Sequence, residues 1–194
     1  MGSKTLGIIA GTLLVAQLGA ASFARAELPY MEVLGATSAP IGYVHLCQRE
    51  PASCMQRTAS PSVVQLTEES WRDLLSINTH VNQTILPVTD ADLYGHPEVW
   101  TMPTQYGDCE DYVLMKRQML IDRGWPASAL LITVVRERSG EGHAVLTVRT
   151  DRGDFVLDNQ DANVLRWDET AYHFIKRQSE FDETVWASIN DGRS

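Results

Sequence analysis

The stretch LLITVVRERSGEGHAVLTVRTDRGDFVLD, residues 130–158, decides the fold class of this chain. It contains three strand-like runs of β-branched and other apolar residues, at 130–136, 143–149 and 154–158. Thr150-Asp151-Arg152-Gly153 joins the last two runs, and so short a joint predicts a tight hairpin. An antiparallel sheet is therefore expected in this half of the chain.

Two helices are expected before this sheet. The first covers residues 67–85, because Thr67 can cap it and apolar residues then recur near helical spacing. The second begins at Asp108 or Cys109 and ends before Gly124, a residue typical of helix C-termini.

The remaining segments complete an α+β arrangement. Residues 27–65 are expected to form an irregular N-terminal arm, and residues 86–107 a loop. Residues 172–177 and 184–189 are expected to be two further strands, although a terminal helix is the alternative. Helices followed by an antiparallel sheet indicate one α+β domain over residues 27–194.

Four polar side chains in the two helices pose a question of orientation. Asn78 and Asn82 lie one turn apart beside the apolar face, so they either hydrogen-bond buried backbone or line a site. Lys116 and Arg117 are expected to face solvent.

Residues 1–26 are typical of a secretory signal peptide. Lys4 gives a positive start, residues 6–18 an apolar run, and Ala24-Arg25-Ala26 the pattern of small residues that precedes cleavage. The apolar run is shorter than the roughly 20 residues of a transmembrane helix. We expect a periplasmic or secreted protein, cleaved after Ala26 and without a membrane span thereafter; a retained N-terminal anchor is the alternative.

The charge of the remaining chain excludes two classes of partner. The leader contains Lys4, Arg25 and no acid, so 14 of the 16 basic residues and all 25 acidic residues remain, a net charge of −11. Nucleic acids and anionic membrane surfaces are bound by clustered lysine and arginine. Neither is expected as a partner.

The three cysteines form an odd set. Cys47 and Cys54 enclose a short loop, which an oxidising compartment would close with a disulfide. Cys109 is then left as a free thiol. Its place at the start of a helix favours the thiolate, because unpaired N–H groups and the helix dipole stabilise negative charge there.

A thiol nucleophile needs a base and a group that orients the base. His143 is the best candidate among five histidines, since it starts a strand and can point into a cleft. If Asp151 and Arg152 form a two-residue turn, Asp158 lies opposite Val145 and diagonal to His143 on one face. Asp158 could then orient the imidazole. A slip of one residue would place the two on opposite faces.

Three motifs carry a family resemblance: Gly107-Asp108-Cys109-Glu110-Asp111-Tyr112, Gly142-His143-Ala144-Val145-Leu146 and Val156-Leu157-Asp158-Asn159. Together they resemble the bacterial transglutaminase-like cysteine proteinases, including the LapG-type periplasmic proteases. The similarity covers roughly residues 65–190 and extends to Tyr94-Gly95, Trp100, Pro103 and Trp167. It implies a papain-like or transglutaminase-like α+β fold with Cys109, His143 and Asp158 as catalytic residues.

The resemblance also implies calcium beside the nucleophile, with Asp108 and Glu110 matching the acidic ligands of LapG-type members. Electrostatics gives separate support, because Asp108, Glu110 and Asp111 crowd a thiol that works as an anion. Bound Ca²⁺, which prefers oxygen ligands, would cancel this repulsion. The alternative is that the acids simply favour a helix N-terminus. No organic cofactor is expected.

The function expected is that of a thiol endopeptidase acting on a cell-surface or periplasmic protein. LapG-type members cleave a surface adhesin, but proteolysis is better supported here than the adhesin as target. One alternative is acyl transfer or deamidation at glutamine, as in transglutaminases, which share the triad. A second is a non-catalytic, calcium-dependent binding module. The sequence does not identify a regulatory protein partner.

Overall fold

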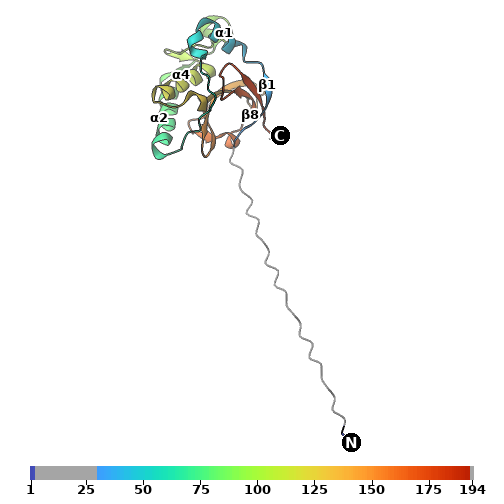
Figure 1. Cartoon of the computed structure of the whole chain (residues 1–194). Helices are drawn as coiled ribbons and strands as arrows, with labels where there is room; N and C mark the ends of the chain where they lie inside the picture. Colours follow the sequence, from blue (N-terminus) through green and yellow to red (C-terminus); the bar gives the residue numbers. More distant parts are fainter. Residues whose placement is uncertain (3–29, 193–194) are drawn as a thin grey trace.

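The computed structural model describes residues 1–2 and 30–192. The predicted cleavage after Ala26 therefore lies outside the described residues. A seven-stranded antiparallel sheet in the order β1-β9-β8-β4-β5-β6-β7 forms the centre of the fold. Helices α2 and α4 lie together on one side of the molecule, away from strands β1 and β8 (Figure 1). This is the predicted α+β class.

The strands of the sheet are β1 (Glu32–Thr37), β4 (Leu130–Arg136), β5 (Gly142–Thr150), β6 (Gly153–Leu157), β7 (Leu165–Arg166), β8 (His173–Gln178) and β9 (Trp186–Asn190). The helices are α1 (Ile41–Arg49), α2 (Glu68–Thr84), α3 (Asp90–Tyr94) and α4 (Cys109–Asp122), with short 3-10 turns η1 (Pro51–Cys54), η2 (Ala127–Ala129) and η3 (Trp167–Glu169). A small parallel pair consists of β2 (Leu86–Pro87) and β3 (Tyr106–Gly107). No helix within residues 30–192 is long and apolar enough to cross a membrane.

The predicted helices and C-terminal strands are confirmed. Thr67 caps α2, and its hydroxyl accepts a hydrogen bond from the Ser70 N–H at 3.2 Å. Gly124 follows α4 with a φ of +87°, the left-handed conformation that glycine adopts readily at a helix end. The last two predicted strands are β8 and β9, so the alternative of a terminal helix is wrong.

The predictions of an irregular arm over 27–65 and a plain loop over 86–107 are wrong. The first segment contains β1 and α1, and the second contains α3. Strand β1 pairs with β9 at the far end of the chain, and its residues are all exposed, so no buried alternation marks it. In α1, Gly42 packs so closely on Trp100 that a Cβ atom there would lie 2.3 Å from the indole ring.

The sheet separates two apolar clusters. On β5, Leu146 and Val148 pack into the larger cluster, together with residues of α2 and α4. Val145, the residue before Leu146, packs into the smaller cluster with Val156 of β6 and Phe174 of β8. This alternation is the period of two that a sheet buried on both faces requires. It also fixes which side chains of the hairpin share a face.

The predicted disulfide joins Cys47 in α1 to Cys54 in η1, with 5.6 Å between their Cα atoms, and Cys109 is free. The bond closes a short loop against a helix whose start, Pro40 and Ile41, lines the cleft described below.

Replacing both Cys47 and Cys54 by serine should lower stability by about 2–3 kcal/mol, because the unfolded chain regains the entropy of an open loop. For a domain of this size that is a fall of about 5–10 °C in the melting temperature. Calorimetry of the double variant and of reduced wild type measures it. Equal midpoints for oxidised and reduced protein would contradict the expectation.

Candidate active site

The hairpin of β5 and β6 has the predicted register. Leu146 pairs with Leu157, and Thr150 pairs with Gly153 across the two-residue turn. The next residue beyond β6 is Asp158, whose carboxylate Oδ1 lies 2.8 Å from Nε2 of His143. Both side chains are buried. The structure therefore brings the predicted base and the predicted orienting acid into direct contact.

The Asp158 carboxylate has further donors. Oδ1 also accepts from the Gln160 N–H at 3.0 Å, and Oδ2 accepts from the Tyr172 hydroxyl at 2.5 Å. Burial raises the pKa of Asp158, but hydrogen bonding to His143 and its charge, aided by these donors, hold the pKa below its usual value. Asp158 is thus an ionised, fixed partner for the imidazole.

Sequence reasoning missed Gln160 and Tyr172. The Gln160 side chain lies 3.4 Å from Nδ1 of His143, and the Tyr172 ring packs against the imidazole with centroids 5.4 Å apart. Gln160 follows Asp158 by two residues, which could have drawn attention to it. Tyr172 immediately precedes β8, and no spacing in the sequence relates it to the hairpin.

Cys109 opens α4 and shares one cleft with His143. The cleft has a volume of about 460 Å³ and is lined by Cys109, Glu110, His143 and Ala144, with Trp100, Ile41 and Lys176 among its other walls. Nε2 of His143 bonds Asp158, and the side-chain amide of Gln160 lies 3.4 Å from the other ring nitrogen, Nδ1. Cys109 and His143 therefore line one cleft, and Asp158 contacts His143.

The thiol donates a hydrogen bond to Glu110 Oε2 at 3.0 Å. Burial raises the pKa of the Cys109 thiol, and the charge of Glu110 raises it further. The helix terminus alone therefore does not yield the thiolate that the sequence predicted. A positive charge that offsets the neighbouring carboxylates would favour the thiolate.

Asp108 and Glu110 converge with a third acid that sequence reasoning missed, Asp90 of α3. Carboxylate oxygens of the three lie within 4.8 Å of one another. Burial, with the charge of Asp108, raises the pKa of Glu110 to about 9. Within the described chain, Oδ1 of Asp90 and Oδ1 of Asp108 are buried without a hydrogen-bond donor. Such a group of oxygens fits a divalent cation that prefers carboxylates.

Asp111, the other acid of the motif, lies outside this group. Its Oδ1 accepts from the Thr101 N–H at 2.9 Å, and its side chain packs against Gly107, where a Cβ atom would come within 2.7 Å of Oδ2. Asp111 therefore connects the loop before α4 to the helix through this hydrogen bond.

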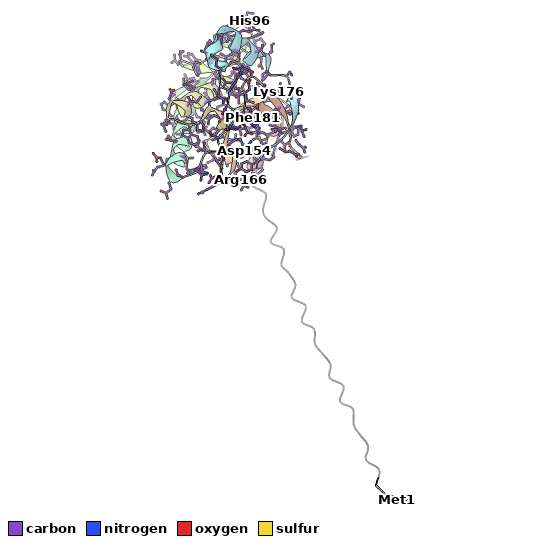
Figure 2. All side chains as sticks on the ribbon, viewed as in Figure 1. Met1, His96, Asp154, Arg166, Lys176 and Phe181 are labelled. Atoms are coloured by element: carbon purple, nitrogen blue, oxygen red, sulfur yellow. A yellow bond between two sulfur atoms is a disulfide. The ribbon has the colours of Figure 1, made fainter. Side chains whose placement is uncertain are left out.

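The remaining histidines do not compete with His143. His45, His80, His96 and His173 are exposed, and His96 lies at one end of the molecule (Figure 2). His143 alone of the five is buried beside a carboxylate and lines the cleft.

The two asparagines of α2 hydrogen-bond backbone, one of the two predicted roles. Asn78 donates to the Ala162 carbonyl at 3.2 Å, and Asn82 donates to the Asp158 carbonyl at 2.8 Å. Asn82 thus connects α2 to the residue that orients His143.

The prediction that Lys116 and Arg117 face solvent is wrong. Helix α4 packs against both α2 and β5, so several of its polar positions are interior. Arg117 forms a buried ion pair with Glu183 at 2.6 Å. Lys116 is fully buried, and its ammonium lies 5.8 Å from the centre of the Tyr112 ring.

Replacing Lys116 by methionine should stabilise the protein by about 1–4 kcal/mol, because burying an ammonium costs more than burying a thioether. Burial lowers the pKa of Lys116 from 10.5 to about 7, although the charge of Asp158 opposes the shift. The unfolded chain then binds the extra proton between these values, so wild-type stability rises with pH across this window. The difference in melting temperature between Lys116→Met and wild type should be largest near pH 6 and nearly absent near pH 10. A difference that does not change with pH would contradict the prediction.

The family model for bacterial transglutaminase-like cysteine proteinases matches residues 33–194. No curated protein matches the sequence. Among solved structures, calcium-bound LapG of Legionella pneumophila is similar, with 22% identity and a TM-score of 0.50, over 56% of this chain and 64% of that chain. A second LapG structure from that organism gives 23% identity and a TM-score of 0.49, over 56% and 63%. The chain thus matches less than two thirds of LapG, and at this identity the likeness concerns the fold.

Proposed function

Because the chain belongs to the bacterial transglutaminase-like cysteine proteinase family, we propose that it is an exported thiol endopeptidase that cleaves a cell-surface or periplasmic protein. The nucleophile is Cys109, the base is His143, and Asp158 orients the base. The observation that carries this assignment is the buried His143–Asp158 pair at 2.8 Å, whose histidine lines one cleft with the free thiol.

The chemistry follows from these positions. Nδ1 of His143 takes the thiol proton, and the sulfur of Cys109 attacks the carbonyl carbon of the scissile peptide. Unpaired N–H groups in the first turn of α4 stabilise the oxyanion. The imidazolium then protonates the leaving amine, which leaves a thioester on Cys109. Water attacks the thioester and gives its proton to Nδ1, which restores the thiol when the acid product departs.

Asp158 contributes by holding the ring. Its bond to Nε2 fixes which nitrogen faces the cleft, and its negative charge stabilises the imidazolium formed in each half-reaction. Tyr172 and the Gln160 N–H keep the carboxylate in place.

Calcium would be held by Asp90, Asp108 and Glu110, whose oxygens form the group described above. When bound, the ion supplies positive charge that offsets the carboxylates around the thiol. The calcium-bound form of LapG supports calcium as the ion. A bound cation would also account for a nucleophile that stands between two acids.

Export rests on the signal-like residues 1–26 and on the Cys47–Cys54 disulfide, which an oxidising compartment favours. The mature protein would begin at Glu27. Intact mass of the protein purified from its producing cells tests this start.

The decisive test is comparative proteomics of the exported fraction from cells that carry wild type or Cys109→Ala. A new protein N-terminus that depends on Cys109 supports the proposal and identifies the substrate. Amine-linked glutamine in place of a new terminus would indicate transglutaminase-type acyl transfer. If neither product appears and iodoacetamide labels Cys109 no faster than the denatured protein, the domain is a binding module.

A further inference from the structure

The N-terminal segment, residues 30–49, supplies one wall of the cleft that contains the nucleophile. Pro40 and Ile41, where α1 begins, line this cleft together with Cys109 and His143. Among the cleft residues of the described chain, Ile41 is the only large apolar one that is exposed, at 58%. Single apolar residues on a surface are common, so exposure alone indicates nothing. Exposure inside the wall of the cleft places this side chain where a substrate would lie.

Helix α1 is held against a second wall residue, Trp100. Gly42 leaves no room for a side chain beside the indole, and the Tyr43 ring packs edge-on against the same indole with centroids 5.8 Å apart. At the end of the helix, the Arg49 guanidinium donates to the Trp100 carbonyl at 2.6 Å. The side chain of Ile41 therefore extends from a fixed backbone, and a substrate that contacts it does not first have to order the helix.

Other walls of the cleft are apolar too, and two charged wall residues outside the acidic group have partners within the protein. Val134 and Ala144 contribute aliphatic surface. Nζ of Lys176 donates to the carbonyl of the N-terminal segment at 2.8 Å, and the Glu98 carboxylate accepts an indole N–H at 3.2 Å. What the open part of this wall offers a substrate is thus apolar surface, which is stabilised when an apolar group covers it.

We propose that Ile41 is a specificity-determining residue that binds an aliphatic side chain on a residue flanking the scissile bond of the substrate. The inference rests on the proposed function, because it assigns a subsite of the same cleft. It narrows the substrate class to proteins whose cleaved segment carries a residue such as leucine or valine beside the cut. A difference of a few methyl groups in an apolar pocket changes the specificity of an enzyme about tenfold or more.

The test is the cleavage of long peptides, prepared from whole-cell protein by chemical cleavage at methionine, in excess calcium. New termini that appear with wild type and not with Cys109→Ala define the cuts. At one flanking position, aliphatic residues should be enriched over polar ones about tenfold. Ile41→Ala should abolish this enrichment at that position alone. A wall that is merely loosened would slow cleavage at all sites alike and leave the enrichment unchanged.

Two further variants sharpen the test. Leu34→Ala is the matched control, because Leu34 is an aliphatic residue of the same N-terminal segment, 56% exposed on β1 and not among the residues that line the cleft. It should keep the wild-type enrichment. Ile41→Asp should replace aliphatic residues by lysine and arginine at the flanking position. Aspartate suits the first turn of a helix, so α1 should still form in this variant.

The inference is overturned if wild type shows no aliphatic enrichment beside its cuts, or if Ile41→Ala or Ile41→Asp keeps the wild-type enrichment. Failure of the proposed function gives a different result. In that case no terminus depends on Cys109, either in these peptides or in the exported fraction, and the subsite falls with it.

Discussion

Replacing His143 by alanine should lower turnover about 10³–10⁴-fold, because one imidazole serves as base and then as acid on a thiol whose pKa burial raises. Cys109→Ala should abolish turnover. Asp158→Asn should retain about a hundredth of it, because an orienting group contributes less than the groups that transfer protons. Rates are measured on a peptide spanning the cleavage site that proteomics identifies, and calorimetry checks that each variant folds.

His173→Ala is the matched control for the histidine variant. His173 is exposed on β8, beside Asp191, so its loss should leave turnover within about twofold of wild type. If His143→Ala keeps near wild-type turnover while His173→Ala loses it, His143 is not the base.

Removal of calcium by excess chelator should lower the melting temperature by about 5–10 °C and suppress turnover. An ion that binds only the folded state, at a free concentration of a hundred times its Kd, stabilises that state by about 2.7 kcal/mol. For a domain of this size, losing that stability lowers the melting temperature by about 5–10 °C. Turnover falls because no positive charge then offsets the acidic group of Asp90, Asp108 and Glu110 next to the nucleophile. Magnesium should substitute poorly, since it demands a tighter octahedral shell.

Asp90→Asn and Asp108→Ala should each reproduce the effect of the chelator and abolish any further response to it. Asp92→Asn is the matched control, because Asp92 is exposed on the same short helix as Asp90. It should respond to the chelator like wild type. Identical midpoints for wild type in calcium and in chelator, with no metal in the purified protein, would show that these acids serve only the helix terminus.

The parts of the fold that the sequence predicted are those whose signals are local. The cap at Thr67, the end of α4 at Gly124 and the two-residue turn before Gly153 each depend on neighbouring residues. The hairpin register follows from that turn and from alternation, and this register places His143 beside Asp158.

What the sequence could not predict depends on contacts between distant segments. Strand β1 is defined by its pairing with β9, and Lys116 is buried because two other elements cover α4. Asp90 joins the acidic group, and Tyr172 reaches Asp158, only when separate segments dock. A helical wheel cannot show that a helix is covered on most of its faces, and no periodicity relates residue 90 to residue 108.

The turn at Asp151 and Arg152 also bears on when the proposed active site is complete as the chain folds. His143 and Asp158 are 15 residues apart on one hairpin, so bringing them together closes a short loop at small entropic cost. Cys109 belongs to a helix in another layer and meets them only when α4 docks on β5. A chain that has formed its hairpin but not this interface would hold the proposed base without the proposed nucleophile. Peptide cleavage during refolding should therefore appear with the slower, non-local packing step and lag behind formation of the hairpin.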